Sequence, residues 1–129
     1  MARQAKVAWF ELPADDVQRA SAFYNTVFGW DTPDMGMGNG SVLAITAPSD
    51  EQGNPKETGA INGDISLRSS TFDRPHVVIH VDDLDASLQA AQDAGGSIVQ
   101  PRQDVPEAGM AYATIEDTEG NRVGLHQDL

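Results

Sequence analysis

Three histidines and one glutamate are the side chains of this sequence best suited to acid–base or ligand chemistry. The histidines are His76, His80 and His126, and an imidazole titrates close to neutral pH. Glu11 could serve as a base if apolar neighbours raised the pKa of its carboxyl group, and an ordinary solvated charge is the alternative. The chain has no cysteine, so thiolate chemistry and disulfides are excluded.

Alternating strand patterns predict that these four residues share one face of a β-sheet. Side chains of a strand point alternately to its two faces. One predicted face is apolar or small: Ala8, Phe10, Leu12, Val77, Ile79, Val81, Ala111, Ala113, Ile115, Val123 and Leu125. The opposite face carries Trp9, Glu11, His76, His80, Tyr112 and His126. Such a mixed face is typical of a small-molecule pocket, although a solvent-exposed sheet face carries similar residues.

The elements that would position these residues occur twice along the chain. Each half has a strand, a pair of aspartates, a helix ended by glycine, and further strands. Asp15 and Asp82 are the predicted N-caps, and an offset of 67 residues also brings Gly29 onto Gly96. We predict one domain over residues 1–129, with modules at about 5–68 and 75–128.

Composition narrows the classes of partner. The 129 residues carry a formal net charge of −12, which repels nucleic acid and anionic membrane surfaces. No apolar run is long enough for a signal peptide or a membrane span. We therefore expect a cytoplasmic protein with a small-molecule partner and without nucleic-acid or membrane binding.

The two repeated halves resemble the vicinal-oxygen-chelate superfamily, also called the glyoxalase, bleomycin-resistance and extradiol-dioxygenase superfamily. The residues that carry the resemblance are WFELPADDVQRASAFYNTVFGW, HVVIHVDDLDASLQAAQDAGGSIVQP and IEDTEGNRVGLHQ. The resemblance implies an α+β fold with two βαβββ modules. In such a fold the modules form a curved mixed sheet around a central pocket, and the helices lie on the outer face. The reaction is not implied, because members include isomerases, lyases, dioxygenases, epimerases and drug-binding proteins.

The resemblance also implies four metal-ligand positions. They match Trp9, a residue near Gly59–Asn62, His76 and Gly124, and only His76 of these is a strong ligand. A catalytic metal needs at least three donors, so we expect no metal or other cofactor at the usual position. A divalent metal remains an alternative through a relocated site built from residues of the same face, namely Glu11, His80 and His126.

We interpret the chain as a protein that binds a small organic molecule in a central cavity without the usual metal, as bleomycin-resistance proteins do. The alternative is a metal-dependent glyoxalase-like lyase or isomerase, or a dioxygenase-type enzyme, acting on a substrate with vicinal oxygens. A role in pairing with another chain is a third alternative, and family members commonly form homodimers. The predicted ligand-binding residues are Trp9, Glu11, His76, Tyr112 and His126. His76 and Glu11 are the candidates for catalysis.

Overall fold

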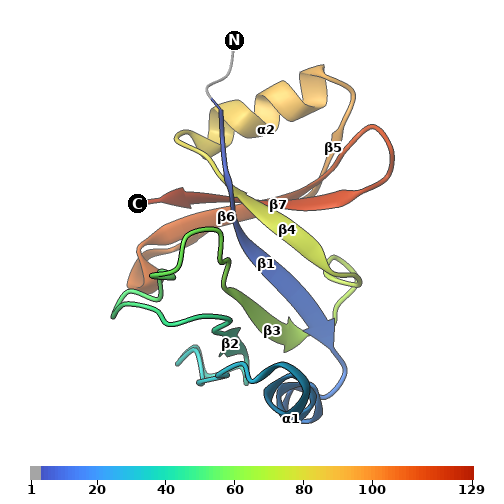
Figure 1. Cartoon of the computed structure of the whole chain (residues 1–129). Helices are drawn as coiled ribbons and strands as arrows, with labels where there is room; N and C mark the ends of the chain where they lie inside the picture. Colours follow the sequence, from blue (N-terminus) through green and yellow to red (C-terminus); the bar gives the residue numbers. More distant parts are fainter. Residues whose placement is uncertain (1–3) are drawn as a thin grey trace. The chain divides into compact units, whose positions relative to one another are not determined.

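The computed structural model describes residues 4–129, which form an α+β fold with two compact units (Figure 1). We call Trp9–Pro75 the N-terminal unit. The C-terminal unit combines His76–Leu129 with the described part of Met1–Ala8. The elements in chain order are β1 (Val7–Ala14), α1 (Val17–Phe28), β2 (Val42–Ala44), β3 (Gly63–Leu67), β4 (His76–His80), α2 (Leu84–Asp93), β5 (Ser97–Val105), the 3₁₀ turn η1 (Pro106–Ala108), β6 (Met110–Glu116) and β7 (Arg122–Asp128).

The N-terminal unit contains the strands β2, β3 and β1 in that spatial order. β3 runs parallel to β1 and antiparallel to β2. The Gly-rich segment before β2 makes only isolated bridges, from Asp31 to Ile45 and from Asp34 to Val42. This segment takes the place of one strand in a βαβββ order.

Both helices begin one residue later than the sequence analysis predicts. The N-caps are Asp16 and Asp83, whose carboxylates accept hydrogen bonds from the backbone N–H groups of Arg19 and Ala86 at 3.0 Å. An N-cap side chain satisfies an N–H group two or three residues on, so the second aspartate of each pair is the one within reach. The offset of 67 residues between the two halves is unchanged by this correction.

The C-terminal unit contains the strands β4, β7, β6 and β5 in that spatial order. β4 and β7 are parallel, and the other two pairs are antiparallel. β5 continues through Pro101 with two irregularities in its pairing with β6. Proline is tolerated there because β5 is the edge strand of this unit's sheet.

Each unit packs one face of its sheet against its own helix. In the N-terminal unit Phe10, Leu12 and Ile65 join the core with α1. In the C-terminal unit the core residues are Val81, Leu84, Leu88, Ala111, Ala113 and Leu125, with Ile79, Ile98 and Ile115 against them. Most residues of the predicted apolar face thus lie in the two cores, but Ala8, Val77 and Val123 do not, and Val77 is 42% exposed. We call the opposite side of each sheet the helix-distal face.

The helices of the described residues are short. α1 has 12 residues and α2 has 10, and no helix among residues 4–129 is long and apolar enough to cross a membrane.

Candidate functional site

The helix-distal face of the N-terminal unit brings two predicted residues to one that the sequence analysis missed. Trp9 and Glu11 lie on β1, and Glu11 is the register partner of Asp64 on the parallel strand β3. Ile65, the next residue of β3, lies in the core with α1. Asp64 therefore points to the same side as Trp9 and Glu11.

Asp64 is buried and both of its carboxylate oxygens accept hydrogen bonds. Only 4% of the residue is exposed. The indole N–H of Trp9 donates to Oδ1 at 2.7 Å, and the hydroxyl of Ser66 donates to Oδ2 at 2.7 Å. A further hydrogen bond joins the Asp64 carboxyl group to that of Glu11. Two carboxyl groups in such contact share a proton, because like charges this close cannot both ionise freely.

Burial raises the pKa of Asp64 to about 8, and the neighbouring charge of Glu11 acts in the same direction. The hydrogen bonds from Ser66 and Trp9 oppose this rise because they stabilise the carboxylate. Near neutral pH the Asp64 carboxyl group is therefore mostly protonated. It can donate a hydrogen bond while Glu11 beside it accepts one, and a pair of this kind can also move a proton.

The sequence gives only a weak indication that Asp64 belongs to a site. Asp64 is the one acid in the strand Gly63–Leu67, and as the neighbour of Ile65 it must lie on the opposite strand face from that isoleucine. The region Thr58–Leu67 has few β-branched residues, and only the register with β1 shows that this acid meets Glu11. Local patterns do not contain that long-range pairing.

In the C-terminal unit, His76 faces Gly124 across the parallel strands β4 and β7. A Cβ atom at Gly124 would lie 3.3 Å from His76 Nε2 and 3.0 Å from a methyl group of Val78. His76 is 8% exposed, so the strongest sequence candidate is a buried imidazole. Gly124 is the register partner of Val78, and Asp64 is the register partner of Glu11. Because Val78 and Glu11 are related by the offset of 67 residues, Asp64 and Gly124 occupy equivalent places in the two halves.

Tyr112 and His126 are register partners on β6 and β7. Tyr112 is 36% exposed, whereas His126 is half-buried and close to His80 and Asp128. Burial lowers the pKa of His126, the charge of His80 lowers it further, and Asp128 opposes both. His76, Tyr112 and His126 thus share the helix-distal face of one unit, and Trp9 and Glu11 share that of the other. A single pocket for all five stays a prediction.

The residues at the usual metal-ligand positions of the resembled family do not fit a metal. Trp9 offers no lone pair, and its N–H is bonded to Asp64; Gly124 has no side chain. The amide of Asn62 is engaged with Thr46, Ser49 and Gly53. Asp64, the first-half equivalent of Gly124, is a second possible donor beside His76, and both of its oxygens already accept hydrogen bonds. Two donors are still fewer than the three that a catalytic metal needs.

Two surface hollows lie elsewhere in the N-terminal unit. The larger, of about 710 Å³, is lined by residues between Gly29 and Gly53, and the smaller by residues between Asn25 and Pro33. Neither is lined by a predicted ligand-binding residue. Both are open and carry no buried ionisable group, so we place no site in them.

Comparisons with known proteins agree on one family. The sequence model of the Glyoxalase/Bleomycin resistance protein/Dioxygenase superfamily matches residues 6–125. A Mycobacterium tuberculosis protein named "Putative glyoxylase CFP32" is 31% identical over 136 residues, which cover 97% of this chain and 46% of that protein. The chain thus spans about half the length of this relative. A glyoxylase-like domain-containing protein of Didymella fabae is 29% identical, with 94% of this chain and 92% of that protein covered.

Solved structures share the fold at low sequence identity. A superfamily member from Vibrio splendidus 12B01 superposes with a TM-score of 0.62 at 11% identity, covering 98% of this chain and 100% of that one. A variant of Streptomyces coelicolor methylmalonyl-CoA epimerase, in complex with 2-nitronate-propionyl-CoA, superposes with a TM-score of 0.64 at 15% identity, covering 95% of this chain and 96% of that one. At these identities the likeness concerns the fold alone.

Proposed function

Because the chain belongs to the Glyoxalase/Bleomycin resistance protein/Dioxygenase superfamily, we propose that it binds a small organic molecule without a metal at the usual position. The Glu11–Asp64 carboxyl pair is the group that recognises this molecule. The proposal concerns the helix-distal face of the N-terminal unit, on which both carboxyl groups lie.

The observation that supports the proposal is the burial of Asp64 on the face directed away from α1. A buried carboxyl group costs free energy that an apolar residue at the same place would not. Asp64 is nevertheless only 4% exposed and sits beside a second carboxyl group. A buried carboxyl group beside a second, half-buried one, outside the helix-packed core, is the arrangement expected of a functional site.

The chemistry of the pair limits the ligand class. On binding, the shared proton can turn from Glu11 toward a carbonyl or ether oxygen of the ligand, and the Glu11 carboxylate then accepts from a hydroxyl or an amine. The pair holds one net negative charge when it shares one proton, and the chain as a whole carries −12. We therefore propose neutral or cationic ligands with an oxygen acceptor next to a hydrogen-bond donor. Polyanions are disfavoured.

The two tryptophans provide a direct test by NMR. Trp9 donates its indole N–H to Asp64, whereas Trp30 packs in the core with α1. EDTA-treated protein would be titrated with a fragment library of small hydroxyketones, amino alcohols and aromatic amines. Binding at the proposed site shifts the Trp9 indole resonance and leaves that of Trp30 in place. Shifts confined to Trp30, or no binding by any fragment, would reject the proposal.

Matched variants identify the recognising group. Asp64→Asn and Glu11→Gln each remove one carboxyl group and keep the side-chain size, so both should weaken the binding of a fragment hit by about tenfold or more. Glu51→Gln changes an exposed carboxylate of the same unit and should have no effect. Equal affinities of all three variants, or binding that requires added metal, would contradict the proposal.

A proton-transfer enzyme is the second candidate, and the raised pKa of Asp64 favours it. A carboxyl group that titrates near neutral pH next to a second one is suited to removing and returning a proton. Incubation of the EDTA-treated protein with hydroxyketones in D₂O tests this candidate. Catalysed loss of the C–H signal next to the carbonyl, absent in Asp64→Asn, would favour the enzyme over a binding protein.

A further inference from the structure

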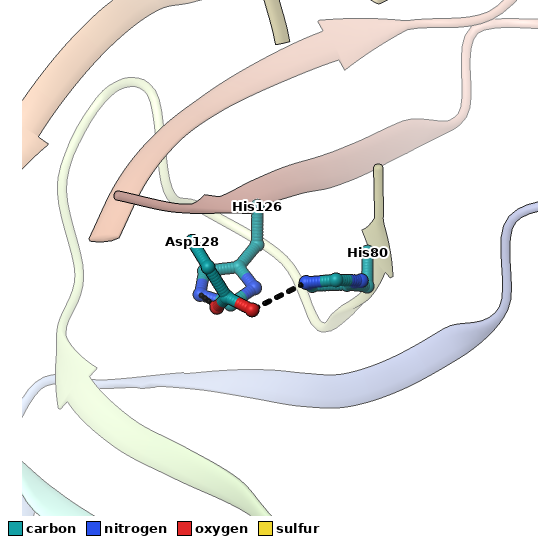
Figure 2. A group of neighbouring side chains, drawn as sticks. All are labelled: His80, His126 and Asp128. Carbon is teal, nitrogen blue, oxygen red and sulfur yellow. Dashed lines mark hydrogen bonds and ion pairs between the residues drawn. The ribbon is translucent and has the colours of Figure 1, made fainter. Parts of the chain in front are cut away.

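Three side chains of types that can ligate a metal lie close together on the helix-distal face of the C-terminal unit. Figure 2 shows His80 on β4, and His126 and Asp128 on β7, with their polar ends turned toward one another. The Nε2 atom of His80 lies 3.1 Å from Oδ2 of Asp128, and Nε2 of His126 lies 3.7 Å from Oδ1. One ligand atom from each of the three residues lies within 4.8 Å of the others.

Strand geometry holds these residues together. His80 and His126 are register partners on parallel strands, and their ring centroids are 5.2 Å apart. Asp128 follows His126 by two residues and therefore points to the same face. The backbone N–H of His80 donates to Lys6 O at 3.0 Å, and that of Val81 donates to His126 O at 2.8 Å. Sites built on paired strands keep their geometry better than sites on loops.

We propose that His80, His126 and Asp128 form a binding site for a divalent first-row transition metal of the zinc class. The ligands would be the two imidazole Nε2 atoms and one carboxylate oxygen. Two imidazoles and a carboxylate suit Zn²⁺, Co²⁺, Ni²⁺ or Cu²⁺. Ca²⁺ and Mg²⁺ prefer sites made only of oxygen atoms.

The spacing of the donor atoms supports the proposal. In a tetrahedral zinc site with bonds of about 2.0–2.1 Å, ligand atoms lie roughly 3.3–3.4 Å apart. Each imidazole lies near this distance from one of the two Asp128 oxygens, His80 at 3.1 Å from Oδ2 and His126 at 3.7 Å from Oδ1. A set with a single ligand atom from each residue lies within 4.8 Å. Three protein ligands would leave the fourth position open, as in catalytic zinc sites. The Asp128 side chain is 74% exposed, so the site is accessible from solvent.

The proposed site differs from the metal position of the resembled family. His80 lies four residues beyond His76 on β4, and His126 lies two residues beyond Gly124 on β7. At about 3.3 Å per residue, these steps correspond to roughly 13 Å and 7 Å along the strands. The proposed site also contains neither residue of the Glu11–Asp64 pair, so a zinc titration can succeed or fail whatever the outcome of the fragment titration.

The test is a zinc titration of tag-free, EDTA-treated and dialysed protein by isothermal calorimetry. Tag-free protein is required because a polyhistidine tag binds the same metals. We expect one equivalent of Zn²⁺ to bind. His80→Ala, His126→Ala and Asp128→Asn should each weaken binding by at least about tenfold, since even the loss of a supporting residue typically costs 10–100-fold. Circular-dichroism melts without metal check that each variant folds.

The matched control is His76→Gln, which removes the third histidine of the chain from the same strand. It should leave zinc affinity unchanged, and zinc should shift the imidazole NMR signals of His80 and His126 but not that of His76. Loss of affinity in His76→Gln would place the metal elsewhere and overturn the proposal. Absence of binding, or binding unaffected by both His80→Ala and Asp128→Asn, would reduce the group to an ordinary ion pair. Asp128→Asn keeps the shape of an exposed side chain, so it remains informative if a histidine variant fails to fold.

Discussion

The indole N–H of Trp9 donates to a carboxylate oxygen of Asp64 that is 55 residues further along the chain, at 2.7 Å. The equivalent places in the second half hold His76 and Gly124, where an imidazole faces a residue without a side chain. The two halves thus share their backbone pairing, whereas the side chains at these two positions differ. The buried acid lies in the first half, and the imidazoles lie in the second.

Our first prediction concerns the pH dependence of stability. The pKa of Asp64 is raised to about 8 from an ordinary value of 3.8, so the folded state keeps a proton that the unfolded state releases. Between about pH 4 and pH 8 the contribution of Asp64 to the free energy of unfolding must therefore fall as pH rises, by at most about 1.4 kcal/mol per pH unit. Asp64→Asn should gain stability relative to the parent protein across this range.

Urea unfolding of both proteins at pH 5, 6, 7 and 8 measures this difference. Other carboxylates contribute to the pH dependence of both proteins, so the informative quantity is the parent-minus-variant difference. Glu51→Gln, an exposed carboxylate of the same unit, should show a flat difference. A flat difference for Asp64→Asn as well would mean that Asp64 is ionised in the folded protein at neutral pH.

The second prediction orders the neighbours of Asp64 by their effect on its pKa. The hydrogen bonds from Ser66 and Trp9 lower the pKa, and Glu11 raises it. Ser66→Ala and Trp9→Phe should therefore move the Asp64 titration to higher pH, and Glu11→Gln should move it to lower pH. Carbon-13 NMR of the Asp64 carboxyl group reports each midpoint directly. A downward shift in Trp9→Phe would show that the indole N–H does not stabilise the carboxylate.

Local sequence patterns predict the elements and core faces of this fold well. The double aspartates and Gly29 delimit α1, and alternation assigns Phe10 and Leu12 to the core with that helix. These features depend on neighbours within a few residues, where capping and strand periodicity operate. The grouping of Trp9 with Glu11 on the opposite face follows from the same periodicity.

The composition of the candidate sites depends on pairings between distant strands, which the sequence does not display. Asp64 meets Glu11 only through the parallel register of β1 and β3, and Asp128 meets His80 only through that of β7 and β4. Alternation correctly places His80 and His126 on one face, but it does not show that they are register partners. Site residues contributed by two strands therefore need the structure.

The third prediction ranks two glycine substitutions. At Gly63 an added Cβ would lie 2.2 Å from the backbone oxygen of Phe10, which cannot move without breaking the sheet. At Gly124 the near atoms belong to the side chains of Val78 and His76, at 3.0 Å and 3.3 Å. Gly124→Ala should cost about 1–3 kcal/mol in the free energy of unfolding, and Gly63→Ala should exceed that range. Urea unfolding of both variants decides the ranking, and equal costs would contradict the close approach at Gly63.

The last prediction concerns which side chains of β4 are buried, because their exposed fractions differ from what strand alternation implies. Alternation alone puts Val77 with the helix-packed core and His76 on a polar face, yet Val77 is 42% exposed and His76 and Val78 are 8% and 7% exposed. Val77→Ala should therefore cost less than about 0.5 kcal/mol, as for a surface substitution, whereas His76→Ala and Val78→Ala should each cost about 1–3 kcal/mol. Guanidinium unfolding at pH 7 compares the three variants. If His76→Ala were as mild as Val77→Ala, the imidazole would contribute little to folding, and its place in the sheet would be explained by ligand binding instead.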